Sequence, residues 1–274
     1  MKSKKDQERQ KRILAAGTTA HYEDALYYDQ AYRRRRHDVR YYAALAGKAR
    51  TPVLELGCGT GRVTLAMAEA GAEVVGVDAM QPMLARAKER LAKSKRAVRE
   101  RVRFVKGDLR TMRLRERFSL VVAPFNVLNH LYARKDFERA FATVRAHLAP
   151  KGRFVFDVIM PYPPNLARDP SRFYRAADVK LASDGKRYAY GESFQYDPAT
   201  QVQLVTMAFR DRADETNLFV MPLAHREIFP EELSMLLHYN GFDVVSRDGG
   251  FEGEALTMAS ESQVVVARAR KGFV

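Results

Sequence analysis

The chain has 274 residues, 46% of them hydrophobic and 29% charged, a globular composition that excludes wholesale disorder. Its 47 lysines and arginines outnumber 33 acidic residues and give a net charge of +14, so nucleic acid or an anionic membrane surface must be considered as a partner. The single cysteine, Cys58, excludes an intramolecular disulfide and a multi-cysteine zinc site.

The N-terminal part of the chain is polar and basic. Residues 1–12 show no core pattern, and we expect a flexible basic tail over residues 1–20. The segment lacks the apolar stretch of a signal peptide, and no run of 18 apolar residues occurs, so we expect a cytoplasmic protein without a membrane span. Between residues 22 and 49, apolar side chains recur at three- and four-residue steps, which predicts helix.

Residues 52–159 alternate between short apolar runs, typical of buried strands, and helical patterns. The expected strands are 52–56, 73–77, 103–105, 118–123 and 153–159, and the expected helices are 63–70, 83–95 and 137–148. Strands that alternate with helices through short connections predict a parallel sheet with helices on both faces.

From about residue 171 the pattern changes to extended segments separated by turn-forming residues. These segments are 188–196, 202–210 and 217–229. They predict an antiparallel β insertion over residues 171–228.

The remaining chain returns to the first pattern. A helix over 230–241 and strands over 242–245 and 263–269 are expected. We therefore predict an α/β domain made of residues 21–170 and 229–274, with seven mostly parallel strands and helices on both faces.

The turn after the first expected strand carries the most specific signal in the chain. It contains Gly57, Cys58, Gly59, Thr60 and Gly61. The third glycine of the dinucleotide-binding fingerprint would stand at Arg62 and is absent, and no P-loop pattern occurs. Glu55 at the strand end would repel a pyrophosphate but accept hydrogen bonds from an ammonium group, and Asp78 after the next strand can accept two from a ribose diol. A ligand with a ribose, a positive charge and no phosphate describes S-adenosylmethionine.

This segment resembles the first motif of the class I, Rossmann-like S-adenosylmethionine-dependent methyltransferases, which has the form acid–x–Gly–x–Gly–x–Gly. The resemblance covers roughly residues 20–160 and 229–269, and it implies a Rossmann-like fold, S-adenosylmethionine as cofactor and S-adenosylhomocysteine as product. It also implies that the insertion over residues 171–228 recognises the methyl acceptor or forms a homodimer contact. The cofactor-binding residues that it implies around the first three strand ends are Glu55, Gly57, Cys58, Gly59, Gly61, Asp78, Ala79, Met80, Asp108 and Leu109. Asp108 would accept a hydrogen bond from the adenine amino group. Alternatively, Asp108 only caps the helix or turn that follows Gly107.

The segment after the fourth expected strand should border the methyl group, because ligands in such sheets lie at the carboxyl ends of the strands. Its Phe-x-x-x-x-His-Leu pattern, from Phe125 to His130, is similar to the loop of small-molecule N-methyltransferases, including those acting on amino sugars. The similarity implies that Phe125 contacts the cofactor and that Asn126 and His130 lie at the methyl acceptor. His130 would hold or deprotonate an amine or hydroxyl, or be a structural hydrogen-bonding group.

Two tyrosines near the N-terminus complete the expected site. The segment with Tyr22 and Tyr28 looks like the tyrosine-bearing lid helix of the same enzyme group. Both side chains would close over the cofactor and exclude water, Tyr22 as a catalytic residue and Tyr28 as a cofactor-binding residue. Packing of Tyr28 in an apolar helical stripe is the alternative interpretation. The other histidines are scattered, and we expect no metal.

Two rival functions remain open at this point. A nucleic-acid methyltransferase would show an acid or Asn followed by Pro-Pro-aromatic after the fourth strand, and residues 123–126 echo that only in part. A non-catalytic S-adenosylmethionine-binding protein is disfavoured by the intact glycine turn and acids. The surplus positive charge falls in three blocks, 1–12, 33–36 and 86–103, and the largest has the pattern of a solvated helix face. We therefore expect a small-molecule acceptor and no nucleic acid.

Overall fold

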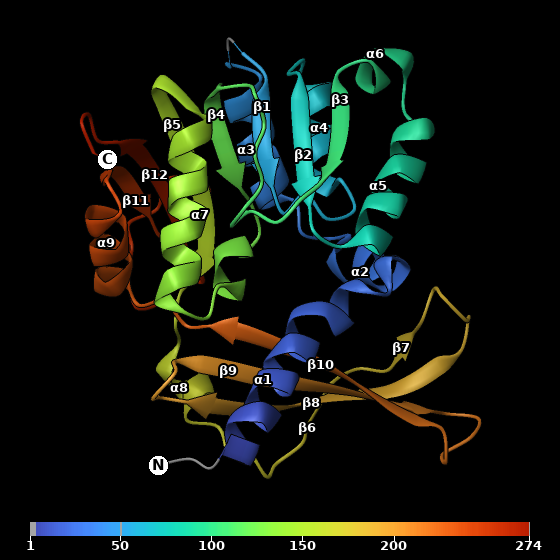
Figure 1. Ribbon diagram of the computed structural model, residues 1–274. Helices are drawn as coiled ribbons and strands as arrows, with labels where there is room; N and C mark the ends of the chain where they lie inside the picture. The colour runs from blue at the N-terminus through green and yellow to red at the C-terminus, as the bar shows by residue number, and fades with distance from the viewer. Residues whose placement is uncertain (1–3, 50, 274) are drawn as a thin grey trace. The chain divides into compact units, whose positions relative to one another are not determined.

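The computed structural model describes residues 4–49 and 51–273, which form two compact units (Figure 1). The parallel-sheet unit contains residues 34–161 and 228–273, and the meander unit contains residues 4–33 and 162–227. Within the described residues, no helix is both long enough and apolar enough to cross a membrane.

The parallel-sheet unit is built on seven strands in the order β11-β12-β5-β4-β1-β2-β3. Their bounds are β1 (Val53–Leu56), β2 (Val74–Asp78), β3 (Val102–Lys106), β4 (Phe118–Ala123), β5 (Leu148–Ile159), β11 (Phe242–Asp248) and β12 (Ser262–Ala269). The first five pair in parallel, and β12 runs antiparallel between β5 and β11. The predicted seven-stranded, mostly parallel sheet is confirmed.

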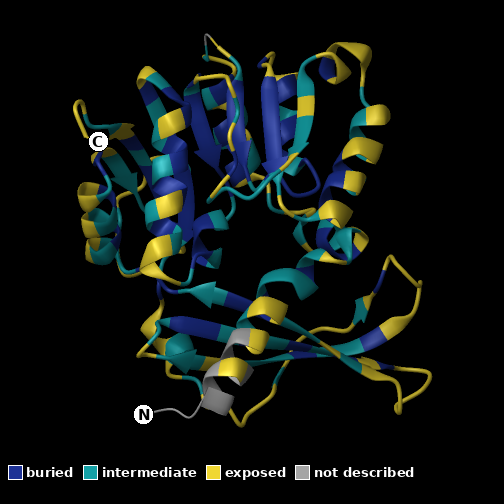
Figure 2. Ribbon diagram, viewed as in Figure 1, coloured by how far each residue is buried: buried dark blue, intermediate teal, exposed yellow. Residues whose placement is uncertain are grey.

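Helices cover both faces of this sheet. They are α3 (His37–Ala46), α4 (Arg62–Glu69), α5 (Gln81–Ala92), α6 (Arg96–Arg99), the short 3-10 helix η2 (Val127–His130), α7 (Arg134–His147) and α9 (Pro230–Tyr239). Because side chains alternate along a strand, Leu54 packs with Phe137 and Phe141 of α7 on one face, whereas Val53 packs with Met67 of α4 on the other. Figure 2 shows the central strands as buried and the outer faces of α5, α7 and α9 as exposed.

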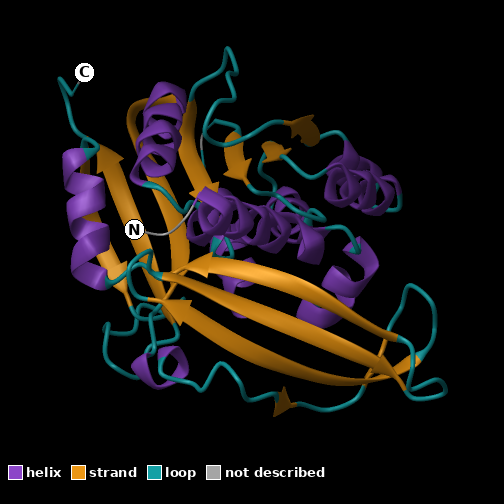
Figure 3. Cartoon of the chain, turned by 60° about the horizontal axis from the view of Figure 1, so that its bottom comes forward, coloured by secondary structure: helices purple, strands orange, loops and turns teal. Residues whose placement is uncertain are grey.

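The meander unit contains a second, antiparallel sheet, which confirms the predicted β insertion. Its strands are β6 (Tyr174–Arg175), β7 (Val179–Lys180), β8 (Arg187–Asp197), β9 (Val202–Asp211) and β10 (Leu218–Arg226). Figure 3 shows β8, β9 and β10 as long strands that run side by side. Phe209, Tyr188 and Val205 lie in its small apolar core. Its helices are α1 (Lys4–Thr19), η1 (Ala20–Tyr22), α2 (Ala25–Tyr32) and α8 (Pro163–Leu166).

The N-terminal segment differs from the expected flexible tail over residues 1–20. Residues 4–19 form α1, which packs on β10, while residues 1–3 lie outside the described part. The contact is close at Gly17, where an added Cβ would lie 2.7 Å from the Cβ of Ala224. A strand some 200 residues away in the sequence, rather than a pattern in the segment itself, supplies the partner of this helix.

The unit boundaries also differ from the expected ones. Residues 21–33 and 162–170, expected in the sheet domain, belong to the meander unit. The helical pattern over 22–49 is divided accordingly into α2 and α3, with the four arginines at 33–36 between them.

Candidate functional site

The glycine turn joins β1 to α4, and its three glycines adopt the left-handed backbone conformation. Gly57, Gly59 and Gly61 have φ values of 68°, 54° and 75°. At Gly57 the space is filled as well, because an added Cβ would lie 2.4 Å from Cγ2 of Val127. The turn therefore brings backbone N–H groups to the carboxyl edge of the sheet and directly against the segment after β4.

Glu55 and Asp78 lie at the ends of the neighbouring parallel strands β1 and β2. Glu55 is 2% exposed, and its carboxyl accepts a hydrogen bond from the Thr64 hydroxyl. Burial raises the pKa of Glu55 to about 8, against the smaller effect of that hydrogen bond. A cationic ligand beside such a buried carboxyl would favour its ionised form and offset the cost of burial.

Asp78 accepts backbone N–H groups with both oxygens. Gly59 N–H donates to Oδ2 over 2.7 Å and Met80 N–H donates to Oδ1 over 2.8 Å. Burial raises the pKa of Asp78, and these N–H groups oppose the rise. Each oxygen keeps further acceptor capacity, so the carboxylate can still take two hydroxyl donors. The pair of acids suits a ligand that carries an ammonium group and a ribose diol.

The other residues expected at the cofactor have mixed surroundings. The Asp108 carboxylate binds the guanidinium of Arg110, whose hydrogen bonds lower the pKa of Asp108, and it also caps the turn by accepting Arg110 N–H. Leu109 packs against the core, and Met80 precedes the first turn of α5 with Ala79 exposed beside it. The turn-capping alternative for Asp108 is therefore observed, and its adenine contact stays a proposal.

Cys58 is buried within the glycine turn. Burial raises the pKa of its thiol well above the ordinary value, which disfavours the thiolate form needed for a nucleophile. Across residues 4–49 and 51–273, no three His, Cys, Asp or Glu side chains gather in a way that could hold a metal ion.

The segment after β4 contains two consecutive residues with left-handed backbone. Phe125 and Asn126 each have φ of 63°, a conformation that costs a residue other than glycine about 1–3 kcal/mol. The Asn126 side-chain oxygen is buried and accepts no hydrogen bond from the residues that the structure describes. His130 ends η2, four residues later, and is half-buried. The expected acceptor-side residues are thus held on one short, strained segment.

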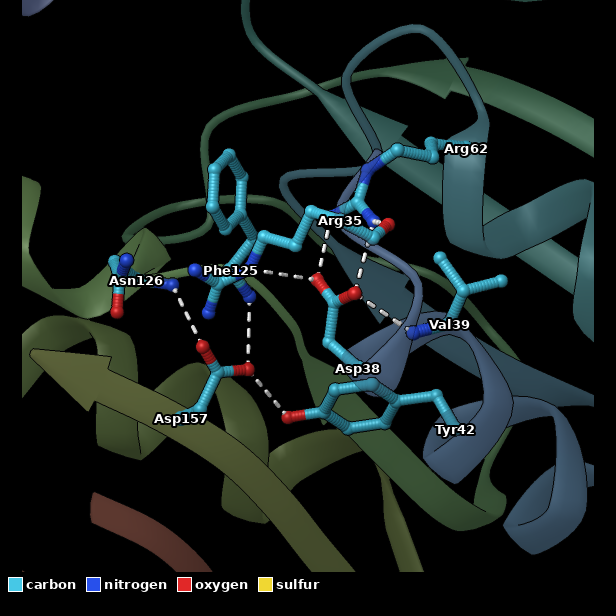
Figure 4. Close-up of polar contacts among 8 residues, drawn as sticks. All are labelled: Arg35, Asp38, Val39, Tyr42, Arg62, Phe125, Asn126 and Asp157. Atoms are coloured by element: carbon cyan, nitrogen blue, oxygen red, sulfur yellow. Dashed lines mark hydrogen bonds and ion pairs between the residues drawn. The ribbon is translucent and has the colours of Figure 1, made fainter. Parts of the chain in front are cut away.

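A buried carboxylate of β5 supports this strained pair (Figure 4). Asp157 is fully buried, and its Oδ1 accepts Phe125 N–H over 2.8 Å and the Tyr42 hydroxyl over 2.7 Å. Its Oδ2 accepts Asn126 N–H over 3.2 Å. The N–H groups of both left-handed residues are therefore bound by one side chain.

A second buried carboxylate, Asp38, holds two arginines beside the Phe125 ring. Arg62 binds it through two hydrogen bonds of 2.9 and 2.6 Å, and Arg35 Nε lies 3.4 Å from Oδ2 (Figure 4). Burial would raise the pKa of Asp38, but the hydrogen bond and charge of Arg62 outweigh it and lower that pKa. The guanidinium carbons of Arg35 and Arg62 lie 4.8 and 5.0 Å from the centre of the Phe125 ring, within cation–π range.

The two tyrosines expected to form a lid lie in the meander unit. Tyr22 and Tyr28 surround the buried His21 together with Tyr27 and Tyr32, in mostly edge-to-face ring contacts. His21 Nε2 also lies 2.9 Å from the Tyr32 hydroxyl. Their role over the cofactor stays a prediction.

Four residues that support the segment after β4 were not expected from the sequence: Asp38, Tyr42, Arg62 and Asp157. Only Asp157 carries a local signal, because it stands inside the otherwise apolar run 154–158, where a charged residue must be bound to be tolerated. Arg90 was missed too, and its guanidinium donates to the backbone and side-chain oxygens of Thr60 in the glycine turn.

Comparison with known proteins places the chain among methyl-transferring enzymes. Residues 53–152 match the family described as methyltransferase domain. The cypemycin N-terminal methyltransferase of a Streptomyces species is 30% identical over 229 residues, which span 78% of this chain and 81% of the relative.

Solved structures agree with that match. The CcbJ methyltransferase from Streptomyces caelestis aligns with a TM-score of 0.72 and 27% identity over 86% of this chain and 90% of its own. The glycopeptide N-methyltransferase MtfA, crystallised with S-adenosylmethionine, aligns with a TM-score of 0.59 and 26% identity over 84% of this chain and 86% of its own. The same enzyme has been crystallised with S-adenosylhomocysteine.

Proposed function

The chain belongs to the class I, Rossmann-like S-adenosylmethionine-dependent methyltransferases of the small-molecule type, and from that premise we propose that it methylates an amine nitrogen of a small molecule or a peptide. S-adenosylmethionine is its cofactor and S-adenosylhomocysteine its product. The observation that supports a nitrogen acceptor is the side-chain oxygen of Asn126, beside the expected methyl position. This oxygen is buried and accepts no hydrogen bond within residues 4–49 and 51–273.

The Asn126 amide oxygen is a sufficient partner for an attacking amine, which needs no base at that step. It accepts an N–H and so aims the nitrogen lone pair, but it cannot take a proton. A neutral amine can attack before it loses a proton, whereas a hydroxyl must lose one as it attacks and needs a base beside it. MtfA is named as an N-methyltransferase and the cypemycin relative as an N-terminal methyltransferase, which supports the same choice.

The chain's own residues divide the work of binding and alignment. Glu55 would hold the ammonium group, Asp78 the ribose diol and Asp108 the adenine amino group, with Met80 and Phe125 packed against the cofactor. Bound S-adenosylmethionine supplies a methyl group on a positively charged sulfur that leaves readily. Asn126 would orient the acceptor nitrogen, and His130 would take the proton released after transfer. Tyr22 and Tyr28 would exclude water.

Other parts of the proposal rest on the sequence. The largest basic block lies on α5, α6 and β3, where Arg86 pairs with Glu89 and Arg96 with Glu100, as expected for a solvated surface. We propose no nucleic-acid acceptor. A cytoplasmic location and a homodimer contact through the β insertion stay predictions.

Product analysis with a matched panel tests the acceptor. The enzyme would be incubated with trideuteromethyl-labelled S-adenosylmethionine and an amino sugar, its N-acetyl derivative, the parent sugar, a peptide with a free N-terminus, its N-acetylated form, and a mixed-sequence RNA. We expect the label on nitrogen of a free amine and none on the acetylated controls. Label on oxygen, or on RNA, would overturn the proposal.

A further inference from the structure

Asp157 binds the two left-handed residues after β4 more completely than any other side chain described. Its carboxylate accepts hydrogen bonds from the N–H groups of Phe125 and Asn126, which follow the carboxyl end of the neighbouring strand β4. It also accepts a hydrogen bond from the hydroxyl of Tyr42 in α3. Three elements that are distant in the sequence therefore meet at one buried group (Figure 4).

The two backbone bonds fix a direction as well as a position. In a left-handed turn successive N–H groups point to the same side, where one carboxylate can accept both. Binding both N–H groups holds the backbone of Asn126 in that conformation, and the conformation decides where its side chain points. The same Asn126 side chain has the buried oxygen without a hydrogen bond in the described structure.

The Phe125 ring is held separately. Arg35 and Arg62 lie over it, and Asp38 keeps both guanidinium groups in place. The segment is thus bound through its backbone by one carboxylate and through its ring by the other. Asp157 alone contacts the backbone of Asn126 among these groups.

We propose that Asp157 is a positioning residue for methyl transfer, because it holds the Phe125–Asn126 backbone so that the Asn126 side chain meets the methyl acceptor. This inference rests on the proposed function, which places the acceptor beside Asn126. It assigns Asp157 no contact with the reacting atoms.

A purely structural role for Asp157 makes a different prediction, and Tyr42 supplies the control. Tyr42→Phe removes one hydrogen bond from the same buried carboxylate but leaves both backbone bonds to Phe125 and Asn126. Asp157→Asn keeps the size and the Tyr42 contact, but its amide group cannot accept at both oxygen positions. Both variants lose a buried hydrogen bond, but only Asp157→Asn loses one that holds the Phe125–Asn126 backbone.

The experiment measures four quantities for each variant and for wild type. They are the melting temperature, the Kd for S-adenosylmethionine by calorimetry, kcat/KM for the best acceptor of the panel, and amide hydrogen exchange at Asn126 by NMR. For Asp157→Asn we expect a loss of about tenfold to a hundredfold in kcat/KM, a cofactor Kd within about twofold of wild type, and faster exchange at Asn126. For Tyr42→Phe we expect a lower melting temperature with kcat/KM within about twofold.

Three results would overturn the proposal. The first is a wild-type kcat/KM in Asp157→Asn, and the second is wild-type amide exchange at Asn126 in the same variant. The third is a loss of kcat/KM in both variants that is proportional to the fall in their melting temperatures. If Asp157→Asn does not fold, Asp157→Glu, which keeps a carboxylate but displaces it, takes the same measurements and the same expectations. If the product carries the label on oxygen, the proposed function fails while the comparison of the variants still decides the role of Asp157.

Discussion

The substitution Glu55→Gln should stabilise the cofactor-free protein and weaken its binding of S-adenosylmethionine. Burial raises the pKa of Glu55 to about 8, from 4.5 for an exposed glutamate. Below pH 4.5 the carboxyl is protonated in both folded and unfolded chains and its ionisation has no effect. Between pH 4.5 and about 8, Glu55 is ionised in the unfolded chain but stays protonated in the folded chain. The free energy of unfolding therefore falls as the pH rises through this window.

The magnitude follows from the size of that window. At about 1.4 kcal/mol per pKa unit, the resistance to ionisation costs the cofactor-free protein about 3 kcal/mol of stability at pH 7. Glutamine has the same shape and can still accept the Thr64 hydroxyl. We therefore expect Glu55→Gln to be more stable than wild type at pH 7 by up to about 3 kcal/mol, and equally stable near pH 4.

Cofactor binding should change in the opposite direction. The ammonium group needs an ionised Glu55, so binding at pH 7 should release nearly one proton from wild type and none from the variant. Loss of a charge-assisted hydrogen bond of about 1.5–3 kcal/mol predicts about tenfold to a hundredfold weaker binding of S-adenosylmethionine.

Denaturant unfolding and calorimetry in buffers of different ionisation enthalpy measure both effects. Glu227→Gln is the matched control, because burial raises the pKa of Glu227, in the meander unit, to about 7. The control should gain stability with unchanged cofactor affinity. Unchanged affinity and proton release in Glu55→Gln would refute the assignment of Glu55 to the ammonium group.

Three further substitutions test other parts of the site. Asp78→Ala should weaken S-adenosylmethionine binding by about 1–3 kcal/mol in calorimetry, because the ribose diol and Gly59 N–H lose their acceptor, and unchanged affinity would contradict this. His130→Ala should lower turnover with near wild-type cofactor affinity, whereas an equal loss of both would mark a structural histidine. Gly57→Ala should lose about 2–4 kcal/mol of stability in denaturant unfolding, because its Cβ would lie 2.4 Å from Val127 Cγ2. Gly71→Ala, with φ of 100° and nothing within 4 Å, should lose only about 1 kcal/mol, and equal losses would count against the steric argument.

The placement of the glycine turn and of the two acids could be predicted because its signals are local. The spacing of Glu55, the glycines of the turn and Asp78 follows from a strand, a tight turn and the next strand, and the structure has all of them where the spacing requires. Parallel pairing of β1 with β2 then brings the two acids to one edge. Short-range geometry therefore determines the positions of these residues.

The support of the segment after β4 could not be predicted, because it depends on distant contacts. Asp38 and Arg62 are 24 residues apart, and Tyr42 and Asp157 are 115 apart. Nothing in the spacing of either pair indicates that they meet. The left-handed conformation of Phe125 and Asn126 is also unpredictable, since neither residue is glycine and the conformation is held by Asp157 from another strand.

The N-terminal segment was mispredicted for the same reason. Residues 4–12 carry many charged side chains and lack an apolar stripe, so a tail was expected. The helix instead packs near its end, where Gly17 allows close approach to Ala224 on β10. Tertiary packing decided the structure of a segment whose local pattern was weak.

A crystal structure of the protein with S-adenosylhomocysteine and the methylated amine tests the central claim most directly. We predict that the amino group of S-adenosylhomocysteine lies at Glu55 and its ribose hydroxyls at Asp78. Its sulfur should face the methylated nitrogen, which should lie within hydrogen-bond distance of Asn126. A sulfur that faces away from residues 125–130, or an acceptor without a contact to Asn126, would contradict it.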